Sequence, residues 1–263
     1  MLEIFLFSML LGLIAGLLAG LFGLGGGVLI VPALVWLLSV YNFPAELLMI
    51  TAVATSLATI VFTSIASVLT HYRLGAIKWD RVFRLTPGIL IGAGAGAIIA
   101  NLIDAEILKG IFIVYLIYIG FRMAFPKRPK KEVKKPKLRL DYLMGNAIGF
   151  CSSILGIGGG TLTVPYLLAR QLAMKNAVAV SSACGLPIAI SGTIVYAVLG
   201  VNNNELPEWS LGYVYLPALA GIIVCSIVTA PIGAKLANKL PAKKLKRYFS
   251  IVLFLIAIKM IVG

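Results

Sequence analysis

Charged side chains are scarce in this chain: they make up 12% of its residues, and only 9 of the 263 residues are acidic. An ordinary soluble domain carries about 25% charged residues. Hydrophobic residues reach 60%, and the mean hydropathy is +1.03. This composition excludes a typical soluble protein and predicts a multi-pass protein of the plasma membrane.

Histidine and cysteine are also rare, with His71 alone and three cysteines at 151, 184 and 225. The cysteines lie inside apolar runs, so a disulfide scaffold is not expected. His71 is expected to be a polar residue at the membrane interface. Because no metal-binding or catalytic-triad spacing occurs, we expect no metal, no cofactor and no enzyme.

All nine acidic residues fall in loops or at the ends of apolar runs. A cation site or proton relay built from buried carboxylates is therefore disfavoured, and an uncharged site with hydrogen-bond donors suits a small anion. The net charge of +14 comes from basic residues in loops. Such a pattern is typical of cytoplasmic loops, so we expect no nucleic-acid partner.

Apolar runs of sufficient length could supply six membrane-spanning helices, since a span needs about 20 residues. Three shorter runs, at 28–38, 142–155 and 162–168, have glycine-rich sequence nearby. Short apolar pieces beside glycines predict half-helices, whose backbone must be buried in protein or line a wet cavity.

One motif occurs twice. Gly-Leu-Gly-Gly-Gly-Val-Leu-Ile-Val-Pro at 23–32 returns as Gly-Ile-Gly-Gly-Gly-Thr-Leu-Thr-Val-Pro at 156–165. A glycine-rich break once in each half is typical of transporters that bind substrate between two repeats.

Lys and Arg predict the orientation of the two halves, because they are enriched in short cytoplasmic loops. Eight basic residues lie within 127–139, so 126–140 is expected to be a cytoplasmic linker. The loop at 71–81 is basic, whereas its counterpart at 200–210 contains no Lys or Arg. Equivalent loops thus lie on opposite faces, and both termini are expected outside the cytoplasm.

The predicted fold is an all-α polytopic membrane protein of two inverted-topology repeats. The first repeat is 1–125 and the second is 141–263. Each contains a helical hairpin broken by glycines and three transmembrane helices.

A new half-helix is expected after each Gly-Gly-Gly, and its first N–H groups have no acceptor within the helix. Together with the helix dipole, these groups can bind an anion. The expected substrate-binding residues combine both glycine triplets with five hydroxyl-bearing residues. They are Gly25, Gly26, Gly27, Thr55, Ser56, Gly158, Gly159, Gly160, Thr161, Ser181 and Ser182. The alternatives are that the glycines allow close helix packing and that the hydroxyls bond their own or a neighbouring helix.

The duplicated glycine motif, the Ala-Val-x-Thr/Ser-Ser phrase after it and Leu-Gly-Tyr-Val-Tyr-Leu-Pro-Ala-Leu at 211–219 resemble the TauE/SafE family of sulfite exporters. This resemblance covers nearly the whole chain. It implies a permease that exports small sulfur-containing anions, such as sulfite or organosulfonates.

We therefore expect alternating access around a central anion site, with a small anion and the lipid bilayer as partners. A homo-oligomer is left open. The alternatives are a passive anion channel and a sulfur-compound carrier that uses the thiol of Cys151 or Cys184.

Overall fold

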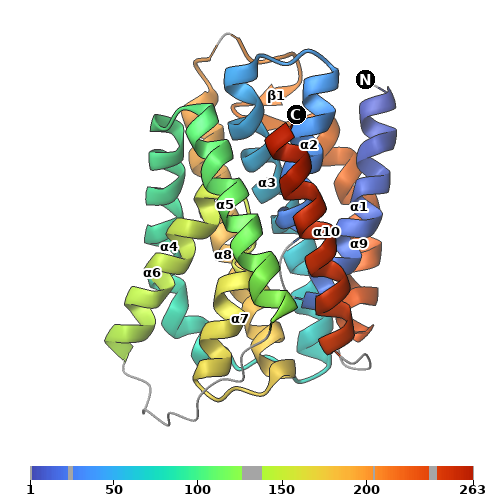
Figure 1. Ribbon diagram of the computed structural model, residues 1–263. Coiled ribbons are helices and arrows are strands. Elements are labelled where there is room, and N and C mark those ends of the chain that lie inside the picture. The colour runs from blue at the N-terminus through green and yellow to red at the C-terminus, as the bar shows by residue number, and fades with distance from the viewer. Residues whose placement is uncertain (1, 23–25, 126–137, 204, 237–241, 263) are drawn as a thin grey trace.

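The computed structural model in Figure 1 describes every residue except 1, 23–25, 126–137, 204, 237–241 and 263. The described residues form ten helices and one two-stranded hairpin. In chain order the elements are α1 (Leu2–Phe22), α2 (Gly27–Val40), α3 (Ala45–Arg73), α4 (Trp79–Leu102), α5 (Ala105–Ala124), α6 (Leu138–Ile154), α7 (Gly160–Ala169), α8 (Met174–Gly200), β1 (Ser210–Leu211), β2 (Val214–Tyr215), α9 (Leu216–Leu236) and α10 (Ala242–Val262).

Six of these helices are long and apolar enough to cross a membrane, namely α1, α3, α4, α5, α8 and α9. The chain is therefore an all-α polytopic membrane protein, as its composition predicts. At 14 and 10 residues, α2 and α7 are too short to span the hydrocarbon core, which is about 30 Å thick.

Both half-helices begin at a glycine-rich break. The residue before α2, Gly26, has φ of 77°, and the residue before α7, Gly159, has φ of 72°. Residues with a Cβ adopt this left-handed backbone at an energetic cost, whereas glycine does so freely. The glycines thus allow the chain to turn into each half-helix inside the bundle.

The two ends of the bundle differ (Figure 1). The N- and C-termini lie at one end, here called the terminus end, whereas α5 ends and α6 begins at the opposite end, here called the linker end. From the interior, α2 runs to the terminus end and α7 to the linker end, and α3 runs from the terminus end to the linker end. This arrangement is compatible with inverted repeats, but the repeat and the orientation in the membrane stay predictions.

Glycines bring two pairs of helices into close contact. A Cβ at Gly12 or Gly20 of α1 would collide with backbone carbonyls of α9, and one at Gly92 or Gly96 of α4 would collide with carbonyls of α6. Small residues every four positions are typical of such backbone contacts in membranes. The first helix of each half thus packs against the fourth helix of the other half, so the halves interlock.

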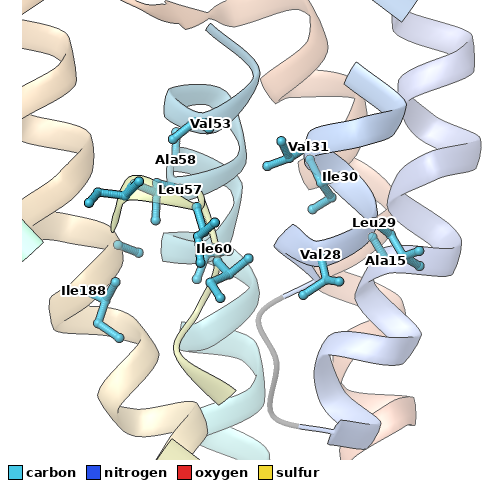
Figure 2. Close-up of a cluster of buried hydrophobic side chains, with 14 of the residues drawn as sticks. Ala15, Val28, Leu29, Ile30, Val31, Val53, Leu57, Ala58, Ile60 and Ile188 are labelled. Atoms are coloured by element: carbon cyan, nitrogen blue, oxygen red, sulfur yellow. The ribbon is translucent and has the colours of Figure 1, made fainter. Parts of the chain in front are cut away.

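The start of α2 is packed in apolar side chains (Figure 2). Val28 and Ile30 of α2 are buried in the same cluster as Leu57 and Ile60 of α3 and Ile188 of α8. The side chains in this cluster are all apolar.

The predicted end of the linker differs from the structure. The linker was expected to reach residue 140, but α6 already begins at Leu138, and 126–137 lie outside the described residues. The motif at 211–219 spans two elements, because its first residues belong to the β1–β2 hairpin and α9 begins at Leu216.

Candidate functional site

The two glycine-rich breaks lie against each other in the interior. A Cβ at Gly27 would collide with the carbonyl oxygen of Gly156, and it would lie 2.9 Å from Oγ of Ser56. The buried Ser56 hydroxyl donates a 2.7 Å hydrogen bond to the same Gly156 carbonyl. Glycine at 27 therefore allows close approach of the backbones, and Ser56 ties α3 to the second break.

The hydroxyl of Thr55, the residue before Ser56, is hydrogen-bonded to the β1–β2 hairpin, which lies at the terminus end. Oγ1 of Thr55 accepts a 3.0 Å hydrogen bond from the backbone N–H of Tyr215 in β2. The Tyr215 ring packs edge-on against Phe43, with 5.0 Å between ring centroids. The β1–β2 hairpin thus covers the first half of α3 from the terminus end.

A small cavity lies beside the second break, level with the second half of α3. Its lining comes from α1, α3, α8 and the segment before α7, and consists of Ala19, Thr63, Ser64, Ser67, Gly158, Ser182 and Gly185. Four of these residues carry a hydroxyl and none is charged. The cavity can therefore offer hydrogen bonds to a ligand without a fixed counter-charge.

Unpartnered hydroxyls gather at the start of α7. Among the described residues, Ser182 has no hydrogen-bond partner for its hydroxyl, and neither do Ser152 and Thr163. All three residues are at most 5% exposed. The hydroxyls of Ser152 and Thr163 would each lie 3.3 Å from a Cβ at Gly159, so they flank the turn into the helix. Buried hydroxyls without partners point to a bound water or ligand.

The start of α2 has no comparable set of polar groups among its described residues. Its first residues after Gly27 are Val28, Leu29 and Ile30, whereas the matching positions in α7 are Thr161, Leu162 and Thr163. The Thr161 hydroxyl is hydrogen-bonded to the Tyr115 hydroxyl of α5. The two half-helix starts are thus chemically unequal despite their matching glycines.

The expected site residues fall into groups in the structure. Thr55 and Ser56 make the hydrogen bonds to β2 and to Gly156 described above, Ser181 is buried on α8, and Gly25 lies outside the described residues. The first break contributes Gly26 and Gly27 to helix entry and packing, and the second contributes Gly159 and Gly160 to the start of α7. Of the expected residues that the structure describes, only Gly158 and Ser182 line the cavity.

Five residues near this site were not expected from the sequence: Thr63, Ser64, Ser67, Gly185 and Tyr115. A signal for the first three was available, because hydroxyls recur every three to four residues from Ser56 to Thr70 and so share one face of a helix. No local pattern pointed to Tyr115, whose contact with Thr161 depends on how α5 packs.

Buried charge occurs near the linker end of the bundle. Asp141 of α6 is 2% exposed, accepts a hydrogen bond from the Tyr166 hydroxyl of α7 and has Arg81 of α4 3.9 Å away. In the first half, the Tyr41 hydroxyl donates a 2.7 Å hydrogen bond to Glu3 of α1. Each hairpin thus has an acid–tyrosine contact between its first helix and the end of its half-helix.

Six apolar helices of spanning length, two half-helices that begin in the interior and a polar cavity beside one of them define a membrane transporter. The chain belongs to the TauE/SafE family, since residues 8–260 match the family model described as sulfite exporter TauE/SafE. This match confirms the resemblance seen in the motifs.

Relatives of similar length share the transporter description. A probable membrane transporter protein of Haemophilus influenzae is 41% identical, with 99% of each chain covered. One of Methanocaldococcus jannaschii is 31% identical over 93% of this chain and 91% of the relative. The probable membrane transporter protein YunE of Bacillus subtilis is 27% identical over 98% and 97%.

Proposed function

We propose that this transporter exports a small sulfur-containing anion, such as sulfite or an organosulfonate, and binds it at the start of α7. The observation that carries the proposal is the cavity beside Gly158, which contains four hydroxyl-bearing residues and no charged side chain. The hydroxyl of Ser182 has no partner among the described residues. The family description supports a sulfur oxyanion as the substrate.

The start of α7 supplies the anion-binding chemistry. The Leu162 and Thr163 N–H groups donate to the Gly159 carbonyl, so the N–H groups of Gly160 and Thr161 are the ones with no acceptor within the helix. The helix dipole adds partial positive charge at this end. Nearby hydroxyls can donate further hydrogen bonds to sulfonate or sulfite oxygens. Because these donors carry no full charge, they can hold an anion without trapping it, as transport requires.

The contacts between the cavity and the terminus end support alternating access. Toward the terminus end, the Ser56–Gly156 and Tyr215–Thr55 hydrogen bonds lie level with the first half of α3. The cavity lies toward the linker end from them. For release at the terminus end, these two hydrogen bonds have to break so that a path opens on that side. At the same time α3 and α8 have to move together around the emptied cavity.

Flux measurements in liposomes test this function. Purified protein is reconstituted, and efflux of labelled sulfite is measured with sulfate, taurine and sulfoacetate as competitors. We expect saturable efflux, and Ser182→Ala should weaken apparent affinity about tenfold because it removes a hydrogen bond to a charged ligand.

Ser8→Ala is the matched control. The Ser8 hydroxyl is likewise buried and has no partner in the described part of the chain, but it lies where α1 packs on α9. Its loss should leave efflux unchanged. Flux no greater than that of empty liposomes for all four compounds would refute the proposal, and flux that rises linearly without saturation would favour the channel alternative.

A further inference from the structure

A polar face of α3 continues past the cavity toward the linker end. Thr63, Ser64 and Ser67 line the cavity, and His71 follows Ser67 by four residues. Residues four apart lie on the same face of a helix, about 6 Å apart along its axis. Thr70 and His71 are therefore the next polar residues on this face, and the Thr70 hydroxyl already donates to the Ala66 carbonyl.

The imidazole of His71 is buried and unpartnered. The residue is 1% exposed, and neither Nδ1 nor Nε2 has a hydrogen-bond partner among the described residues. The sequence predicts an interfacial polar residue at this position, whereas the structure encloses it. Because a neutral imidazole carries one N–H donor, a buried imidazole without partners can donate to a ligand.

An exposed cation lies on the segment that is hydrogen-bonded to the loop after His71. Lys175 in the first turn of α8 interacts electrostatically with His71. Two hydrogen bonds hold the segments together: the Ala76 N–H donates to the His71 carbonyl at 3.1 Å, and Nδ2 of Asn176 donates to the Ala76 carbonyl at 2.7 Å. The residue with the exposed ammonium and the residue with the buried donor are thus held at the same end of the bundle, the linker end.

We propose that Lys175 and His71 form an entry site for a small anion at the linker end, separate from the cavity beside α7. Lys175 raises the local concentration of anions at the surface. His71 then donates a hydrogen bond that replaces one from water as the anion leaves solvent. From there the hydroxyls of Ser67 and Ser64 lead the anion to the cavity. This inference rests on the proposed function and adds a second binding step to it.

Side-specific kinetics test the entry site. Initial rates of labelled sulfite uptake are measured in right-side-out and inverted membrane vesicles, and antibody access to an N-terminal tag identifies the terminus end. With substrate offered at the linker end, His71→Leu and Lys175→Gln should each raise KM about fivefold or more, as expected for one lost hydrogen bond or charge interaction. With substrate offered at the terminus end, KM should not change.

Two further variants separate binding from folding. His71→Gln keeps a side-chain donor and should stay within about twofold of the wild-type KM on both sides. Ser8→Ala removes a buried hydroxyl of α1 that belongs to neither proposed site. It should change the KM on neither side.

The outcomes distinguish the two proposals. Wild-type flux combined with an unchanged linker-side KM in His71→Leu and Lys175→Gln overturns the entry site alone. An equal rise of KM on both sides also overturns it, since that indicates a general structural defect. Absence of saturable flux in the wild type overturns both the entry site and the proposed function.

Discussion

The backbone N–H of Tyr215 donates a hydrogen bond to Oγ1 of Thr55, which lies 160 residues earlier in the chain. The next hydroxyl, that of Ser56, donates to the carbonyl of Gly156. Two adjacent hydroxyls of α3 are therefore used to hold the β1–β2 hairpin and the second glycine-rich break. The hydroxyls that line the cavity begin two turns later, at Thr63.

Removal of the Thr55 acceptor should destabilise the protein. In Thr55→Val the N–H of Tyr215 loses its partner in a buried environment, which costs about 1–3 kcal/mol. Thr55→Ser keeps the acceptor and should lose much less. Thermal unfolding in detergent compares the two variants, and equal melting temperatures for Thr55→Val and Thr55→Ser would contradict this role.

Substitution of Gly27 should affect assembly more than substitution of an unconstrained helix glycine. A Cβ in Gly27→Ala collides with the Gly156 carbonyl, so the two breaks must separate and the yield of folded protein and its melting temperature should fall. At Gly110 of α5, a Cβ would have no described atom of a neighbouring helix within 4 Å. Gly110→Ala should therefore be neutral or stabilising by about 0.5–1 kcal/mol, because alanine favours a helix interior. Size-exclusion profiles and melting curves of the two variants provide the comparison.

The two acid–tyrosine contacts should differ in strength. Tyr166→Phe leaves the buried carboxylate of Asp141 without its hydroxyl donor, which should cost about 1.5–3 kcal/mol. Tyr41→Phe removes an exposed contact to Glu3, and water can replace it. Melting temperatures measured side by side should drop clearly for Tyr166→Phe only, and a larger drop for Tyr41→Phe would argue against burial as the cause.

A cysteine-free variant tests the thiol alternative. All three cysteines are free; Cys184 is buried on α8, Cys151 is exposed on α6 and Cys225 is partly buried on α9. None of them is among the described residues that line the cavity. Replacement of all three by alanine or serine should leave the KM for sulfite within about twofold of wild type. Loss of transport in a variant that still elutes as folded protein would favour a thiol mechanism instead.

The starts of the two half-helices could be predicted from sequence, because a backbone with positive φ favours glycine at that position. Gly26 and Gly159 both have positive φ at the start of a half-helix, and this requirement is local. The hydrogen-bond partner of a buried hydroxyl, by contrast, depends on segments distant in the sequence. Ser56 and Ser182 occupy similar phrases in the two halves, yet Ser56 bonds to Gly156 whereas Ser182 lines the cavity.

His71 shows the same limit. Its position near the end of an apolar run predicts a residue at the interface, but the folded chain buries it, and the loop through Ala76 is hydrogen-bonded both to the His71 carbonyl and to the first turn of α8. A pattern along one helix cannot show which later segment will cover its end.

The sequence by itself determined the membrane class, the two broken hairpins and the family, because hydropathy, glycine placement and motif order depend on residues close together in the chain. Only the tertiary structure decided which half-helix start is polar and which hydroxyls face the cavity. The α2 start packs among apolar side chains and the bonded Ser56 hydroxyl, whereas the α7 start has the unpartnered hydroxyls of Ser152 and Thr163 beside Ile188. That difference arises from packing between helices distant in sequence, where each polar group bonds to whichever partner the assembled bundle brings within reach.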